Sequence, residues 1–127
     1  MMAYVASGRS ADIARLLAAV EQATEEQTAN GAMTRNVGLA TVRAIAAFGR
    51  GRWVETIQFL LPVRYRANAF GGSHAQRDII HRTLLEAAIR QGDRALATSL
   101  AAERTALKPH CPFAWRERQR AEALPAA

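Results

Sequence analysis

RQGDRALATSLAA, at Arg90–Ala102, repeats a pattern that occurs twice earlier in this 127-residue chain, in ASGRSADIARLL (Ala6–Leu17) and GRGRWVETIQFLL (Gly49–Leu61). The copies align on glycines that lie 43 and 41 residues apart, Gly8, Gly51 and Gly92. Glycine tolerates the left-handed conformation that closes a helix, so each copy predicts the corner of an antiparallel helical hairpin. Repeated hairpins stack side by side and bury surfaces that none could bury alone.

The residues that follow each glycine repeat as well. Corresponding side chains fall five, eight and nine positions after the glycine, which places them on one face of the second helix. They are Ile13, Thr56 and Ala97 at five, Leu16, Phe59 and Leu100 at eight, and Leu17, Leu60 and Ala101 at nine. We expect this face to point into the core.

Apolar spacing extends the helix predictions along the chain. We expect helices at Ser10–Thr28, at Thr34–Gly49, from Arg52 to about Ala67, from the glycine pair to Gln91, from Asp93 to about Leu107, and from Pro112 onward. Pro62 should kink or end the third helix near Leu61, because proline removes a helical hydrogen bond. No alternating β-branched pattern predicts a strand. The prediction is an all-α fold of about six helices plus a short N-terminal remnant.

The length fits one domain, residues 1–127. We divide it into a truncated first repeat at 1–29, a second at 30–70, a third at 71–109, and a capping helix and tail at 110–127. The segment MMAYVASG is typical of the end of a first helix whose earlier part is absent.

The net charge of +6 comes from sixteen arginines and one lysine against eleven acids. This keeps open a nucleic-acid or anion-binding alternative. However, an alanine-rich chain that prefers arginine to lysine is also what a GC-rich gene encodes. The single cysteine, Cys111, can form no internal disulfide, and the opening lacks the apolar segment of a signal peptide, so we expect a cytoplasmic protein. No apolar run is long enough to cross a membrane.

The stretch Asp78–Pro109 resembles a tetratricopeptide repeat. The residues at consensus spacings are Leu84, Ala87, Gln91–Asp93, Ala97, Leu107 and Pro109, and Trp115 falls where the next repeat would carry its tryptophan. The sequence departs from the consensus at Ala88, which replaces the usual aromatic, and at Ala101, which replaces a bulkier residue.

A closer resemblance is to the tetratricopeptide repeat protein 38 family. It is carried by GGSHAQRD (Gly71–Asp78), by Glu103–Pro109 and Phe113–Arg116, and by the segments NGAMTRNVGLA (Asn30–Ala40) and LLPVRYR (Leu60–Arg66). Members of that family are several times longer, so the chain resembles their C-terminal portion. The resemblance implies a helical repeat scaffold without an established catalytic activity, and it names no substrate.

GGSHAQRD is the most unusual stretch of the chain. Ser73 and Gln76 have the spacing of a capping box, in which each side chain bonds the other's backbone at a helix start, so we favour a structural role after a sharp turn at the glycines. Two alternatives stay open. The helix start could bind an anion through Ser73, His74 and Arg77, or His74, Asp78 and His81 could share a helix face and bind a metal. A Ser-His-Asp triad on one helical turn has the wrong geometry.

Stacked hairpins form a groove lined by their first helices, and such grooves bind peptides. We therefore predict a non-catalytic protein-interaction module without a cofactor. The helices Thr34–Gly49 and Ser73–Gln91 should offer this groove a polar set: Arg35, Asn36, Arg43, Arg77, His81 and Arg82.

Association is a further prediction. The apolar stripe of Ser10–Thr28 lacks a preceding helix to cover it, so two copies should form a homodimer through this end. For Cys111, Trp53 and Trp115 we expect packing roles. Arg64 and Arg66, beside Tyr65, should lie at a solvated helix end.

Overall fold

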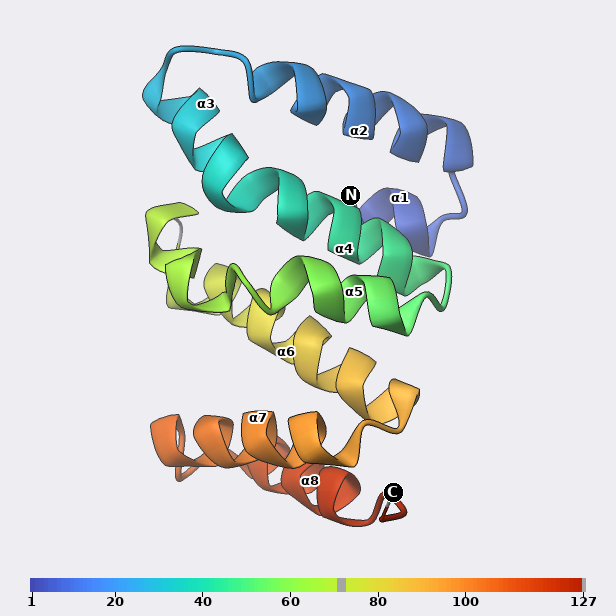
Figure 1. The fold of residues 1–127 in the computed structure, drawn as a ribbon, viewed down its shortest axis with the longest axis vertical. Helices are drawn as coiled ribbons and strands as arrows, with labels where there is room; N and C mark the ends of the chain where they lie inside the picture. Colours follow the sequence, from blue (N-terminus) through green and yellow to red (C-terminus); the bar gives the residue numbers. More distant parts are fainter. Residues whose placement is uncertain (71–72, 127) are drawn as a thin grey trace.

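The computed structural model describes residues 1–70 and 73–126, and every regular element in these two ranges is helical. Figure 1 shows the elements stacked along one direction from the N-terminus to the C-terminus. In chain order they are α1 (Met2–Ala6), α2 (Ser10–Ala23), α3 (Ala29–Met33), the π-helix η1 (Thr34–Gly38), α4 (Leu39–Gly49), α5 (Trp53–Leu60), the 3₁₀ helix η2 (Arg64–Phe70), α6 (His74–Gln91), α7 (Arg94–Leu107) and α8 (Pro112–Glu122). The predicted all-α fold is confirmed.

The three glycine corners have one geometry. Gly8, Gly51 and Gly92 have φ angles of 68°, 70° and 78°, in the left-handed region that glycine enters without a steric cost. At each corner the residue after the glycine donates its backbone N–H to the carbonyl five positions earlier, at 2.9 to 3.1 Å, as in a Schellman motif. Figure 1 shows all three corners along the same edge of the stack. The corners therefore join α1 to α2, α4 to α5 and α6 to α7 as antiparallel pairs.

The repeated positions face the core as predicted. Ile13, Thr56 and Ala97 are all buried, and the Thr56 hydroxyl donates to the backbone carbonyl of Arg52 at 3.0 Å. The later positions are buried in the second and third copies, at Leu60, Leu100 and Ala101, and half-buried at Leu16, Leu17 and Phe59. The largest buried side chains of the core come from α5, α6, α7 and η1: Leu60, Leu84, Leu85, Leu100, Val37 and Thr56.

Two predicted helices have different bounds. The helix expected to reach Thr28 ends at Ala23, and a new helix begins at Ala29 instead of Thr34. The hydroxyl of Thr28 accepts from the backbone N–H of Gly31 at 3.0 Å and so caps the new helix. A Cβ at Gly31 would lie 2.1 Å from the Glu26 carbonyl oxygen, so only glycine permits this close return of the chain.

Pro62 acts as predicted. Helix α5 ends at Leu60, and the chain continues through a turn into η2 rather than as one helix to Ala67. The short helix η2 then lies against η1 and the start of α6. This break places Arg64 and Tyr65 beside the two long helices of the third hairpin, which matters for the pocket described below.

Candidate functional site

One groove of the molecule is lined by the first helix of each hairpin and by α8. It has a volume of about 330 Å³, and its walls come from α1, α4, α6 and α8. We call it the four-helix groove; it is lined by Met2, Phe48, Ile79, Arg82, Thr83, Glu86, Arg90, Phe113, Glu117 and Arg120. The prediction that α4 and α6 contribute to such a groove agrees with this arrangement.

Ion pairs cross the four-helix groove between α6 and α8. Arg120 donates to Glu86 and to Glu117, both at 2.7 Å, and Arg90 donates to Glu86 at 2.7 Å. Burial raises the pKa of Glu86, but the hydrogen bonds from Arg120 and Arg90 outweigh it, so the pKa of this carboxyl lies below its ordinary value. Glu86 is therefore ionised at neutral pH, and both carboxylates already accept hydrogen bonds from arginine.

Aromatic rings lie against the guanidinium groups of Arg82 and Arg90 in this groove. The Arg82 guanidinium carbon lies 4.4 Å from the centroid of the Phe113 ring, and that of Arg90 lies 5.4 Å from the Phe48 ring. Within residues 1–70 and 73–126, no carboxylate pairs with Arg82, whose side chain is exposed. A planar guanidinium stacked on a ring keeps its N–H edge available for a carboxylate.

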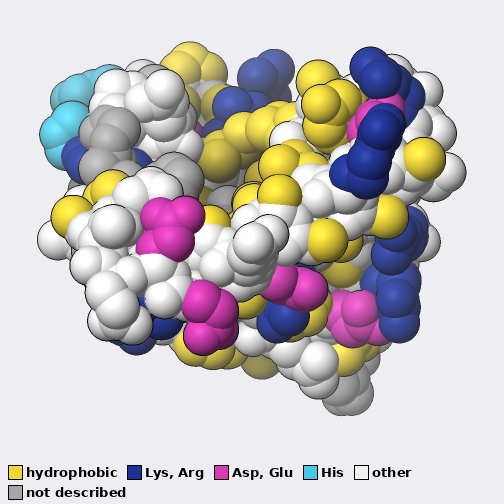
Figure 2. Space-filling view, turned by 90° about the horizontal axis from the view of Figure 1, so that it is seen from above, with side chains coloured by type: hydrophobic (Ala, Val, Ile, Leu, Met, Phe, Trp, Pro, Cys, Tyr) yellow, Lys and Arg dark blue, Asp and Glu magenta, His cyan; other side chains and the backbone are white. Residues whose placement is uncertain are grey.

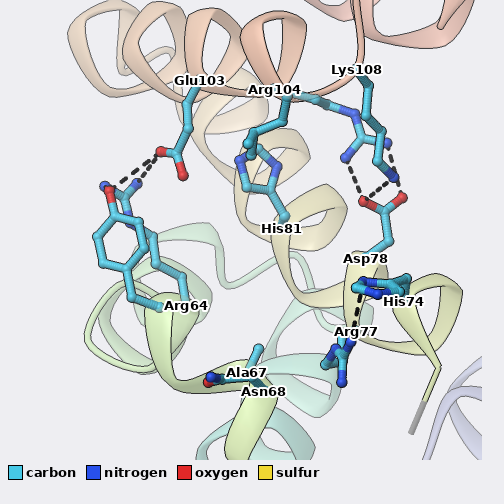
Figure 3. A pocket seen from close by; sticks show the side chains of 12 residues that line it. Arg64, Ala67, Asn68, His74, Arg77, Asp78, His81, Glu103, Arg104 and Lys108 are labelled. Carbon is cyan, nitrogen blue, oxygen red and sulfur yellow. Dashed lines mark hydrogen bonds and ion pairs between the residues drawn. The ribbon is translucent and has the colours of Figure 1, made fainter.

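A second hollow lies between η2, the start of α6 and the end of α7, and Figure 3 shows its side chains. We call it the His81 pocket. Its volume is about 360 Å³, and it is lined by Arg64, Tyr65, Ala67, Asn68, His74, Arg77, Asp78, His81, Glu103, Arg104, Leu107 and Lys108. It shares no lining residue with the four-helix groove.

Asp78 anchors one wall of the His81 pocket. Its two carboxylate oxygens accept from Arg104 at 2.8 and 2.9 Å, and Lys108 donates to one of them at 2.9 Å. The hydrogen bonds from Arg104 lower the pKa of Asp78 far below its usual range, although burial opposes this. Arg104 is 4% exposed, so this bidentate pair joins the start of α6 to the end of α7 largely out of water.

The opposite wall holds a looser pair. Arg64 lies 3.6 Å from a carboxylate oxygen of Glu103, and the Tyr65 hydroxyl donates to the same oxygen at 3.4 Å. The Arg64 guanidinium also lies over the Tyr65 ring, 4.3 Å from its centroid. The prediction of a solvated helix end agrees with the structure for Arg66, which is exposed, and is wrong for Arg64, whose side chain is 16% exposed; Tyr65 between them is 69% exposed.

His81 lies between these two pairs, and Figure 3 shows its ring between Glu103 and Arg104. Both ring nitrogens are buried, and neither has a hydrogen-bond partner in the described parts of the chain. Burial lowers the pKa of His81 below 6.5; the carboxylates of Glu103 and Asp78 oppose this shift, and the guanidinium groups of Arg104 and Arg64 add to it. The imidazole is therefore neutral at neutral pH.

The capping box predicted in GGSHAQRD is present. The Ser73 hydroxyl accepts from the Gln76 backbone N–H at 3.3 Å, and the Gln76 side chain accepts from the Ser73 backbone N–H at 2.7 Å. The expected sharp turn at Gly71 and Gly72 lies outside the described residues. Of the possible anion-binding set, His74 and Arg77 contact each other at 3.1 Å, so the site remains a prediction.

The metal alternative at His74, Asp78 and His81 does not survive in the structure. Asp78 is held by two cations, His74 contacts a guanidinium, and the His81 nitrogens are buried in the pocket wall. Among the described residues, no three histidine, cysteine or acidic side chains are arranged to hold a metal ion. A shared helix face is not sufficient, because neighbouring helices supply cations that occupy the carboxylate first.

The six predicted groove residues do not form one surface. Arg77 and His81 line the His81 pocket, and only Arg82 lines the four-helix groove. The other three are engaged elsewhere: Arg35 donates to the Glu26 carbonyl, Asn36 accepts from Arg66, and Arg43 pairs with Glu21. The phase of helix α4 was misjudged, because the sequence does not reveal the π-helical turn at Thr34–Gly38 that precedes it.

Three smaller predictions have mixed outcomes. Trp53 packs against Phe48 with ring centroids 5.0 Å apart, as expected for a packing residue. Trp115 is 46% exposed, so a core role is wrong for it; its indole N–H donates to the Pro109 carbonyl at 2.8 Å and fixes the ring at the surface. Cys111 is half-buried at the start of α8, where the backbone N–H groups of Ala114 and Phe113 lower the pKa of its thiol.

The face of the molecule shown in Figure 2 carries both acidic and basic side chains. Figure 2 looks onto the α2 end of the stack, and on that face acidic and basic side chains are intermixed instead of forming one basic surface.

In the described ranges, no helix is long and apolar enough to span a membrane. The apolar side chains of α2 are buried at Ile13 and half-buried at Leu16, Leu17 and Val20. The homodimer through this helix stays a prediction.

No family model matches this sequence, and no solved structure is significantly similar to it. The resemblance to the tetratricopeptide repeat protein 38 family therefore stays a prediction, while the helical hairpins rest on the structure itself.

Proposed function

We propose that this protein is a non-catalytic interaction module of the tetratricopeptide type, which binds a peptide segment of another protein in the four-helix groove. The observation that carries the proposal is Arg82. Its guanidinium lies over Phe113 in the wall of the groove, exposed and without a carboxylate from the described residues. A cation displayed in this way is suited to an acidic side chain of a partner.

The surroundings of Arg82 define the peptide further. Ile79, Phe48 and Phe113 give the groove apolar surface, and Met2 at its margin is 53% exposed. Three arginines and two glutamates line it, which leaves a surplus of one positive charge. We therefore propose a peptide in which an acidic residue lies next to aliphatic or aromatic side chains. In this proposal the protein works in the reducing cytoplasm, where a lone Cys111 needs no disulfide partner.

A display library of random twelve-residue peptides tests the proposal. Selected peptides should be enriched in Asp or Glu beside an apolar residue, and their binding should weaken about tenfold with Arg82→Gln, the effect of losing one charge-assisted hydrogen bond of about 1.4 kcal/mol. Arg116→Gln is the matched control, since Arg116 is an exposed arginine of α8 that does not line the groove. Equal affinity of both variants for the selected peptides would contradict the proposal.

A further inference from the structure

The His81 pocket is independent of the proposed peptide groove. The two hollows share no lining residue, although α6 contributes to both. With a volume of about 360 Å³, the pocket falls at the lower end of the range of small-molecule sites, about 300 to 1,000 Å³. The pocket is therefore large enough to hold a small molecule.

The charges of the pocket favour an anion. Its walls carry four cationic side chains and two carboxylates, which leaves a surplus of two positive charges while His81 is neutral: Arg64, Arg77, Arg104 and Lys108 against Asp78 and Glu103. Asp78 is fully engaged by Arg104 and Lys108. A ligand that completes the charge balance carries a negative group.

Arg64 is the cation best placed to receive that group. Its ion pair with Glu103, at 3.6 Å, is longer than the 2.8 Å pair between Arg104 and Asp78, and its other hydrogen bond goes to the neutral hydroxyl of Tyr65, so its charge is the less closely matched of the two. Its side chain is only 16% exposed, which strengthens an interaction with an incoming carboxylate relative to one in open solvent. The planar fork of a guanidinium matches a carboxylate in two hydrogen bonds.

The rim of the pocket favours an apolar body on the same ligand. Tyr65 and Leu107 are 69% and 71% exposed, the highest values among the large hydrophobic side chains of the described residues. Both line the pocket, Tyr65 from η2 and Leu107 from the end of α7. A planar apolar group lying between them would remove surface of both side chains from water.

His81 is a second, independent observation at this pocket. The large majority of buried side-chain polar atoms in proteins have a hydrogen-bond partner, yet among the described residues neither ring nitrogen of His81 has one. The ring forms part of the pocket wall between Glu103 and Arg104 (Figure 3). A ligand bound in the pocket would therefore change the surroundings of this imidazole directly.

We propose that the His81 pocket binds a small carboxylate with a planar apolar body, its carboxylate on Arg64 and its body between Tyr65 and Leu107. Two sources can supply this chemistry, a free aromatic acid and the C-terminal aromatic residue of a peptide. The shared features are one carboxylate and one ring.

Calorimetric titration and NMR of the intact chain test this site with four probes. Phenylacetate should bind saturably and shift the ring resonances of His81, while the uncharged analogue phenylacetamide should bind at least tenfold more weakly. The peptide Gly-Gly-Phe and its C-terminal amide repeat the comparison. Tighter binding of the peptide than of phenylacetate assigns the site to chain ends, and the reverse order assigns it to free acids.

Matched variants locate the contacts. Arg64→Gln should weaken phenylacetate at least tenfold, whereas Arg66→Gln, which makes the same charge change on η2 but acts on a residue bonded to Asn36 outside the pocket, should not. Leu107→Ser should weaken it several-fold, whereas Val54→Ser, another exposed apolar residue outside this pocket, should leave it unchanged. Equal binding of acid and amide, equal effects of the two arginine variants, or no saturable binding of any probe at 10 mM overturns the proposal.

Discussion

Replacing Asp78 by asparagine should destabilise the protein more than any change of a surface ion pair. The substitution keeps the shape of the side chain but removes the charge that binds Arg104 at 2.8 and 2.9 Å. Arg104 is 4% exposed, and its Nε has no partner among the described residues, so its guanidinium would be left buried without a carboxylate.

The size of the effect follows from this burial. Breaking a fully buried pair costs about 3 to 5 kcal/mol, and the 19% exposure of the Asp78 side chain reduces this to roughly 2 to 4 kcal/mol in the free energy of unfolding. For a chain of this length, such a loss lowers the midpoint of thermal unfolding by roughly 10 °C. The loss arises because this pair joins α6 to α7 at the end of the third hairpin that lies opposite the corner at Gly92.

Urea unfolding followed by circular dichroism at pH 7 measures this difference. The control is Glu122→Gln, which removes an exposed pair with Arg118 and should cost less than about 0.5 kcal/mol. Adding Arg104→Met to Asp78→Asn should restore part of the stability, since no charge is then left buried. Because the folded protein lowers the pKa of Asp78, the stabilisation is present above the ordinary value of 3.8 and is lost in stronger acid, where wild type and variant should converge. A cost for Asp78→Asn no larger than that of the control would refute the reasoning.

Three further predictions use the same unfolding assay. Gly92→Ala should cost about 1 to 2 kcal/mol through its φ of 78° alone, since no atom lies within 4 Å of the added Cβ, and Gly92→Asn should cost less; equal costs would contradict this. Ser73→Ala should cost about 1 kcal/mol by removing the α6 cap, and no change would mean that the capping box contributes nothing. Because burial lowers the pKa of His81 below 6.5, the unfolded state takes up a proton first, so stability should fall as the pH drops from 7 to 5; His81→Leu should flatten this slope, and an unchanged slope would exclude His81 as its source.

The helical corners could be predicted from the sequence because the evidence for them is local. Glycine is the residue that most readily takes the left-handed conformation at a helix end, and three copies about forty residues apart reinforce one another. The capping box of Ser73 and Gln76 is equally local, with both partners three residues apart. These features needed no knowledge of what packs against them.

The side-chain partners of the pocket could not be found in the same way. The metal hypothesis for Asp78 considered one helix, whereas Arg104 arrives from the next helix, 26 positions later. A signal was nonetheless present: Asp78 is fourteen residues before Gly92 and Arg104 is twelve after it, so an antiparallel hairpin brings them to the same level. Counting outward from each corner would have placed this pair, although not the unpartnered ring of His81.

The break between Ala23 and Ala29 was expected later in the chain, between Thr28 and Thr34, and the π-helix after it was not predicted. The return of the chain into α3 depends on a close backbone approach at Gly31, where a side chain would meet the Glu26 carbonyl. The polar stretch Thr24–Thr28 indicates that two helices are separated, but it does not mark the residues at which one ends and the next begins. The error in helix phase then carried over to Arg35, Asn36 and Arg43.

The placement of all three glycine corners on one edge of the stack has a consequence for engineering the molecule (Figure 1). The connections on the other edge, such as Thr24–Thr28 and Lys108–Cys111, do not contain a left-handed glycine. Grafting new loops there should alter what the protein recognises while the hairpins keep their pairing. Evolution could diversify such a scaffold along one margin and leave the opposite margin untouched.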